Sequence, residues 1–177
     1  WGMGGYLTVN GILTAWFASE LTDHDCRMLQ ITRGESSAQQ AVEALAVLIA
    51  LRVWADHWKT EGVLLRVRSD SVAALTMALK LKADGKSTNV IAREVALEQA
   101  TANYAPIVAE HAPGVGNVLP DRLSRRFQPS AKPWVLPSPF SEIPETKIAQ
   151  IVYKTLETPA KRNGHRSAFR SNRSRLR

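Results

Sequence analysis

The chain has 177 residues, close to the size of one ordinary domain, and its hydrophobic content of 45% is enough for one sizeable core. The longest apolar run, 44–51, is too short to cross a bilayer, and the lone Cys26 excludes an internal disulfide and a Cys-rich zinc site. The net charge of +7 lies in the C-terminal tail, because residues 1–157 hold 16 basic and 16 acidic residues whereas residues 158–177 hold seven basic residues and no acid. We therefore expect an intracellular protein, cytoplasmic or nuclear, without a membrane partner.

The N-terminal part predicts three β-strands and then a long helix. Strands are expected over 4–9 and 12–19, because the intervening Asn10-Gly11 is a strong signal for a tight hairpin. A third strand is expected over 26–32. The helix is expected over 37–58, a stretch rich in Ala and Leu that contains no Gly or Pro.

The pattern then changes to alternating strands and helices. It predicts a strand over 63–67, helices over 71–83 and 88–104, a strand over 107–110 and a final helix over 117–126. Three strands, a helix, a strand, two helices, a strand and a helix predict an α/β fold.

Proline usage marks a boundary near Phe127. Residues 1–105 contain no proline, whereas six of the nine prolines fall between Pro129 and Pro159. We interpret 1–127 as one domain, 128–141 as a Pro-rich linker and 142–177 as a short helix with a disordered Arg-rich tail. The short helix would be lined by Ile143, Ile148, Ile151, Val152 and Leu156.

Four residues are candidates for chemistry, and each has a structural alternative. Glu43 is the only residue of 41–51 that is not apolar, so it either meets a bound cation or reaches water from the edge of the apolar stripe. Asp70 ends a strand where open α/β sheets place ligands, or it caps the next helix. Asp121 lies in a first helical turn, where the helix dipole alone favours an acid. His111 ends the last strand and is either catalytic or a half-buried surface histidine.

The order of the elements and the residues around these candidates resemble one family. The likeness rests on three motifs: Glu43-Ala44-Leu45-Ala46-Val47 with Ala50-Leu51 and Trp54, Ser69-Asp70-Ser71-Val72-Ala73-Ala74-Leu75, and His111-Ala112-Pro113-Gly114 with Asn117-Val118 and Asp121-Arg122-Leu123-Ser124-Arg125. They resemble ribonuclease H, and more narrowly the ribonuclease H domain that follows reverse transcriptase in gypsy-type retrotransposons. The resemblance covers residues 1 to about 127.

The resemblance implies a fold, a site and an activity. The implied fold is α/β, with a ribonuclease H-like mixed five-stranded sheet flanked by helices and a Pro-rich, basic C-terminal tail. Glu43, Asp70 and Asp121 would be metal-binding carboxylates for two Mg²⁺ ions, with Mn²⁺ as an alternative, and His111 would assist proton transfer or product release. The implied activity is hydrolysis of the RNA strand of RNA–DNA hybrids by a metal-dependent endonuclease, with an upstream reverse transcriptase domain as its partner in the parent polyprotein.

The first strand departs from the family pattern. The family's first catalytic Asp precedes a Gly-rich word like Trp1-Gly2-Met3-Gly4-Gly5, and no Asp or Glu occurs here before Glu20. We therefore expect this chain to cleave hybrids weakly or not at all. The alternative is a catalytically inert ribonuclease H-like module that binds nucleic acid. The start of the chain has no initiator methionine or signal segment, which indicates a piece of a longer protein.

Two groups of side chains are candidates for contacts with nucleic acid. Small polar residues suit the 2′-hydroxyls of a shallow minor groove, and these are Ser37, Gln39, Ser71 and Asn89. Basic residues around the second and third helices suit phosphates, and these are Lys80, Lys82, Lys86 and Arg93. The alternative for the basic group is an ordinary solvated helix face. The Arg-rich tail either binds phosphates non-specifically or serves in solubility or nuclear import.

Overall fold

The structure is a computed structural model that describes residues 1–59, 62–104, 107–132, 136, 139–144 and 148. It begins with an antiparallel hairpin of strands β1 (Gly2–Val9) and β2 (Ile12–Glu20). Asn10 and Gly11 at its tip have φ angles of 52° and 81°, as a tight hairpin turn requires. The predicted hairpin is confirmed.

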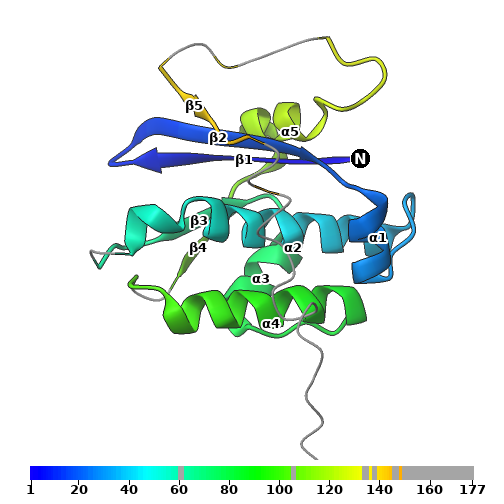
Figure 1. Cartoon of the computed structure of the whole chain (residues 1–177), viewed down its shortest axis with the longest axis horizontal. Helices are drawn as coiled ribbons and strands as arrows, with labels where there is room; N and C mark the ends of the chain where they lie inside the picture. The colour runs from blue at the N-terminus through cyan, green and yellow to red at the C-terminus, as the bar shows by residue number, and fades with distance from the viewer. Residues whose placement is uncertain (60–61, 105–106, 133–135, 137–138, 145–147, 149–177) are drawn as a thin grey trace, which may run out of the picture.

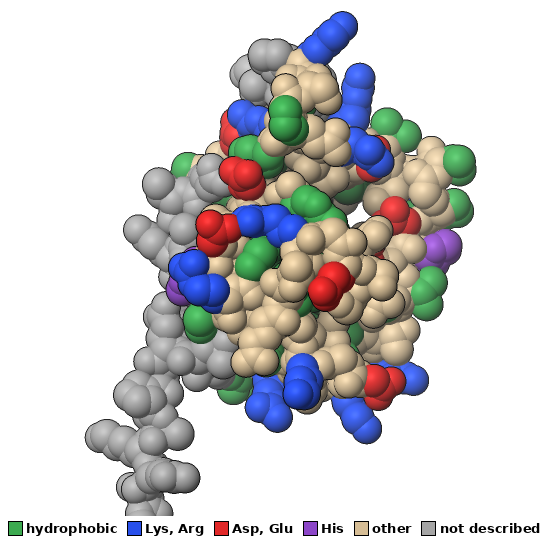
Figure 2. All heavy atoms as spheres, turned by 90° about the vertical axis from the view of Figure 1, so that its right-hand side faces the viewer, with side chains coloured by type: hydrophobic (Ala, Val, Ile, Leu, Met, Phe, Trp, Pro, Cys, Tyr) green, Lys and Arg blue, Asp and Glu red, His purple; other side chains and the backbone are tan. Residues whose placement is uncertain are grey.

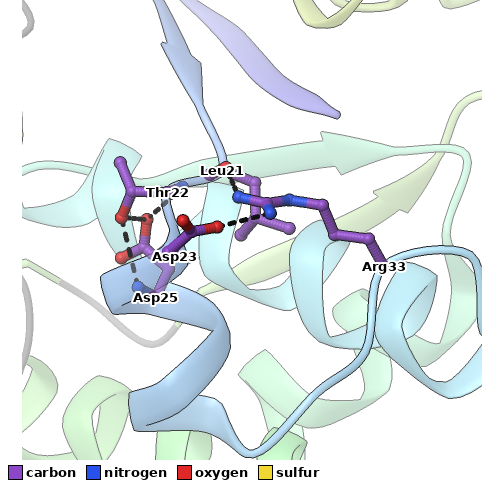
Figure 3. A network of polar contacts seen from close by, with 5 residues as sticks. All are labelled: Leu21, Thr22, Asp23, Asp25 and Arg33. Carbon is purple, nitrogen blue, oxygen red and sulfur yellow. Dashed lines mark hydrogen bonds and ion pairs between the residues drawn. The ribbon is translucent and has the colours of Figure 1, made fainter.

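The strand predicted over 26–32 is wrong, because the chain forms helix α1 (Asp23–Leu29) there. Thr22 begins the helix with a capping box: its hydroxyl oxygen accepts from the Asp25 amide at 3.1 Å, and the Asp25 carboxylate accepts from the Thr22 amide at 2.9 Å (Figure 3). Gln30, with φ 53°, ends the helix in the left-handed conformation. Two satisfied helix ends therefore outweigh the β-type composition of this segment.

An ion pair fastens the start of α1 to the loop that follows it. Arg33 Nη1 lies 2.5 Å from Asp23 Oδ1, and Arg33 Nη2 donates to the Leu21 carbonyl at 2.7 Å (Figure 3). The hydrogen bond from Arg33, together with its positive charge, lowers the pKa of the Asp23 carboxyl. Both side chains are largely in water, so this contact orients the loop and contributes little stability.

The long helix is α2 (Ser36–Val53), and a turn of 3-10 helix, η1 (Ala55–Trp58), follows it. The predicted helix over 37–58 is thus interrupted at Trp54. Most of α2 is buried, because it lies between the β1–β2 sheet and helix α4 (Lys86–Thr101) (Figure 1). Its Ala- and Leu-rich sequence suits burial on several sides.

The remaining predicted elements of residues 1–127 are present. They are β3 (Arg66–Ser69), α3 (Val72–Lys80), α4, β4 (Val108–His111) and α5 (Val118–Ser124), with a short 3-10 turn η2 (Gly114–Gly116). Strands β3 and β4 are parallel, and the register pairs Arg66 with Val108 and Ser69 with His111. The α/β class is confirmed.

The predicted five-stranded sheet is not found in the described part of the chain, where the strands form two separate sheets. One has the order β1-β2-β5 and the other consists of β3 and β4. Strand β5 (Ser141–Glu142) lies parallel to β2, and the Ile143 amide donates to the Trp16 carbonyl at 2.9 Å. Since the segment predicted as the third strand is helical, the outer edge of β2 is open to this later strand.

Two clusters of buried side chains lie on opposite faces of the β1–β2 sheet. Phe17 belongs to the main core with α2, whereas its neighbour Trp16 belongs to a second cluster with Leu123 of α5. Leu136 and Phe140 pack against this second cluster. Packing on the domain therefore continues past the predicted boundary at residue 127 and into the predicted linker.

The segment beyond β5 is described at few positions. Ile148 is 3% exposed and belongs to the main core. Ile151, Val152, Leu156 and the Arg-rich tail lie outside the described residues. Within the described ranges, none of the helices combines the length and the apolar character needed to span a membrane.

Candidate functional site

Asp70 and His111 lie at the same edge of the β3–β4 sheet. The register pairs Ser69 with His111, and the Ala112 amide donates to the Ser69 carbonyl at 2.9 Å, so the two strands end together. Both Asp70 and His111 are exposed. The carboxyl ends of parallel strands are where open α/β sheets usually bind ligands, and this edge is therefore the candidate site.

The structure decides between the two interpretations of Asp70. Helix α3 is capped by Ser71, whose hydroxyl oxygen accepts from the Ala74 amide at 3.2 Å, and the Ser71 amide donates to Ser69 Oγ at 3.0 Å. The expectation that Asp70 caps this helix is wrong. Its carboxylate is exposed and makes no hydrogen bond or ion pair with any described residue, and its role as a ligand-binding residue stays a prediction.

Asp121 is carried by α5, whose position depends on two glycines of β1. A Cβ atom on Gly4 would lie 2.3 Å from Leu123 Cβ, and a Cβ atom on Gly2 would lie 2.3 Å from the Ser124 carbonyl oxygen. Any larger residue at these positions would push α5 away from the sheet. The Gly-rich start of the sequence is the signal for this close approach, although a helix contact there was not predicted.

The Asp121 side chain is half exposed at 50%, and Arg125 Nε donates to its Oδ1 at 2.8 Å. This pair joins residues one helical turn apart on the surface of α5, where such contacts add little stability. An acid in this first turn is also favoured by the helix dipole. The helix-dipole interpretation therefore remains open beside the metal-binding one.

Glu43 lies on α2, which packs on β1 from the face of the sheet opposite to α5 (Figure 1). The side chain is half-buried, and Gln39 Nε2 donates to Glu43 Oε1 at 3.2 Å. Glu43 thus sits at the border of the apolar stripe with a polar neighbour. This is the geometry expected for an acid that reaches water from the edge of a core.

The three predicted metal ligands do not form a metal-holding group in this structure. Among the described residues, no group of three or more His, Cys, Asp or Glu side chains is placed to bind one ion. The structure brings Asp70 and His111 to one edge, whereas Glu43 and Asp121 are carried by helices on opposite faces of the other sheet. Metal binding therefore stays a prediction, and we derive no catalytic step through a metal ion.

Of the predicted 2′-hydroxyl contacts, Ser37 and Gln39 are exposed near the start of α2 and Asn89 is half-buried on α4. Ser71 is buried at 8% exposure, and its hydroxyl is used by the cap of α3. Ser71 is therefore poorly placed for contact with a ligand.

The four basic residues predicted to contact phosphates lie at the end of α3, in the loop that follows it and on α4. Lys80 ends α3, Lys86 begins α4, Lys82 lies between them, and Arg93 follows on α4; all four side chains are exposed. Figure 2 shows basic side chains along the lower edge of the molecule, where α4 lies, with one acidic side chain among them and others above. The clustering fits a phosphate-binding surface and also an ordinary solvated helix face.

Comparisons with known proteins do not extend this picture. A scan against protein-family models, a search of curated proteins and a search of solved structures each returned no match. The motifs and the geometry of the candidate edge are therefore the only indications of function.

Proposed function

We propose that the chain is a nuclease domain of the ribonuclease H type, which hydrolyses the RNA strand of RNA–DNA hybrids as part of a reverse transcriptase polyprotein. The observation that best supports this proposal is that Asp70 and His111 lie at one edge of the β3–β4 sheet. Ser71, and not Asp70, caps α3. Residues from two of the three motifs thus lie where two adjacent parallel strands end, at the edge where an α/β sheet usually binds ligands.

The chemistry assigns a role to each residue at this edge. Hydrolysis of a phosphodiester develops charge on the attacking and leaving oxygens, and bound Mg²⁺ would supply the stabilisation of that charge. Asp70 would offer carboxylate oxygens, the ligands that Mg²⁺ prefers, and Glu43 and Asp121 are the further ligands proposed from their motifs. His111 is exposed at the end of β4, where the register pairs it with Ser69, and would carry a proton to or from a substrate oxygen.

A second candidate function is a module that binds nucleic acid without cleaving it. It is favoured by the lack of a three-ligand group in the part of the chain that the structure describes. The exposed lysines around the α3–α4 connection would serve either function, because phosphate contacts are independent of catalysis.

The two functions are separated by assaying the 177-residue chain on an RNA–DNA hybrid labelled in the RNA strand, with Mg²⁺, with Mn²⁺ and with a chelator. The nuclease predicts weak, metal-dependent cleavage of the RNA strand. Asp70→Asn should abolish it, and His111→Ala should slow it by roughly 10² to 10⁴-fold, the usual contribution of a general acid or base. Asp84→Asn is the matched control, because Asp84 is an exposed acid at the far end of α3.

Cleavage that persists in Asp70→Asn would contradict the proposed site. Binding of the hybrid without cleavage in either metal would favour the inert module. A chain that neither binds nor cleaves the hybrid would reject both functions.

A further inference from the structure

The strand that leads to Asp70 has one open face. From Gly62 to Asp70 the residues alternate without a break between exposed and half-buried positions. Val63, Leu65 and Val67 pack against the main core, so the other set faces away from it. The open set consists of Gly62, Leu64, Arg66, Arg68 and Asp70.

This open face is unusual for parallel strands, which are normally covered by other elements on both faces. The Arg66 and Arg68 side chains are 59% and 57% exposed. Val108 and Glu110 continue the same face across β4, because the register places them opposite these arginines. This face of β3 and β4 is therefore a surface that no described helix or strand covers.

The positive charge on the face is concentrated at Arg66 and Arg68. Glu110 contacts both arginines, with Arg68 Nη2 at 3.2 Å from one carboxylate oxygen and Arg66 Nη1 at 3.8 Å from the other. One carboxylate thus aligns two guanidinium groups, and the second carboxylate of the face, Asp70, follows Arg68 at the candidate edge. Planar guanidinium groups bind phosphate with two parallel hydrogen bonds, which an ammonium group cannot do.

Asp70 is the next member of the open set after Arg68. Alternate residues of a strand are about 6.6 Å apart, so this spacing separates the two arginines along β3, and Asp70 follows directly after the strand ends. A nucleic-acid strand that follows β3 would place successive phosphates beside Arg66 and Arg68 and then reach the candidate edge.

We propose that Arg66 and Arg68 bind the backbone phosphates of the nucleic-acid strand that reaches Asp70, with Glu110 as the residue that positions them. This inference rests on the proposed function, since it supplies a binding track for the same edge. It assigns the two arginines as binding residues rather than catalytic residues.

The test is the salt dependence of binding, measured on the full chain by fluorescence anisotropy with a short labelled RNA–DNA hybrid in a chelator, so that no cleavage occurs. Each lost phosphate contact lowers the slope of log affinity against log salt by about 0.7 to 0.9. We expect Arg66→Gln/Arg68→Gln to lower the slope by about 1.4 to 1.8 and Arg66→Lys/Arg68→Lys to restore most of it. Circular dichroism checks that both variants fold.

The matched control is Arg27→Gln/Lys59→Gln, which removes the same charge from exposed positions on α1 and after η1. A slope that falls equally in this control, or that does not change in Arg66→Gln/Arg68→Gln, would overturn the inference. The proposed function fails separately, if the parent chain shows no salt-dependent binding and no cleavage of the hybrid.

Discussion

A buried ionic cluster joins α2 to α4 and gives the sharpest test of what holds the fold together. Arg52 Nη2 donates to Glu94 Oε2, and Arg52 Nε donates to Glu98 Oε1 at 2.7 Å. The Arg52 and Glu94 side chains are 2% and 0% exposed, and Glu98 is 17% exposed. We expect Arg52→Met to lower the free energy of unfolding by about 3 to 5 kcal/mol at neutral pH, because it leaves a buried carboxylate without its cation.

The magnitude follows from the burial of the pair. Since the Glu94 side chain is 0% exposed, water cannot replace the hydrogen bond that Arg52 donates, and removing one partner of a buried pair costs about 3 to 5 kcal/mol. Glu98 is 17% exposed and stays in contact with water, so the loss of its hydrogen bond to Arg52 adds about 1 kcal/mol or less.

The assay is urea unfolding followed by tryptophan fluorescence at about pH 7, with the denaturant slope checked for constancy. Arg52→Met/Glu94→Leu should recover most of the loss, since it removes the stranded carboxylate. Arg33→Met is the matched control, because it breaks the exposed pair with Asp23 and should cost less than about 1 kcal/mol. A loss of stability in Arg52→Met that is below about 1 kcal/mol, or no larger than that of Arg33→Met, would refute the reasoning.

Three further predictions concern single side chains. Gly4→Ala should lower the free energy of unfolding in urea by about 1 to 3 kcal/mol, because its Cβ would overlap Leu123. Gly114→Ala is the control, because its Cβ would meet no atom within 4 Å. Equal losses of stability in the two variants would contradict the close packing of α5 on β1. Thr22→Ala should cost about 0.5 to 2 kcal/mol through loss of the capping box, and an unchanged thermal midpoint would argue against it. Burial, followed by the negative charge of Glu98, raises the pKa of Tyr104 to about 12, so the folded chain keeps a proton that the unfolded chain loses above about pH 10. Stability should therefore fall as the pH rises from about 10 to 12, and Tyr104→Phe should remove that part of the fall; the same alkaline profile in both proteins would contradict the assignment.

Local patterns in the sequence were sufficient for most elements within residues 1–127. The hairpin followed from Asn10-Gly11, because few residue pairs accept positive φ at both positions. The long helix followed from an unbroken Ala- and Leu-rich stretch. These features depend on neighbours close in the chain, so they can be predicted without knowledge of the fold. The helix α1 was missed although its signal, Thr22 three residues before Asp25, is also local.

The candidate site was predictable only in part, because it depends on contacts between segments far apart in the chain. Motif spacing placed Asp70 and His111 at the ends of two strands, but only the parallel register of β3 and β4 brings them to one edge. Sequence could not show whether Asp70 or Ser71 caps α3, because adjacent residues of similar capping strength compete and backbone geometry selects one. The arrangement of Glu43 and Asp121 depends on how two helices pack on a sheet.

The sequence by itself therefore determined the α/β class, the hairpin, the main helices and the candidate residues, because each depends on propensities and spacings within one segment. Only the tertiary structure decided that the strands form two sheets, that Ser141–Glu142 takes the outer edge of β2, and that Arg52 is buried with two acids from α4. Those outcomes depend on contacts between segments far apart in the chain. A strand edge is stabilised only by a second strand, and a buried charge only by an oppositely charged side chain. No local sequence pattern shows which distant segment supplies that strand or side chain.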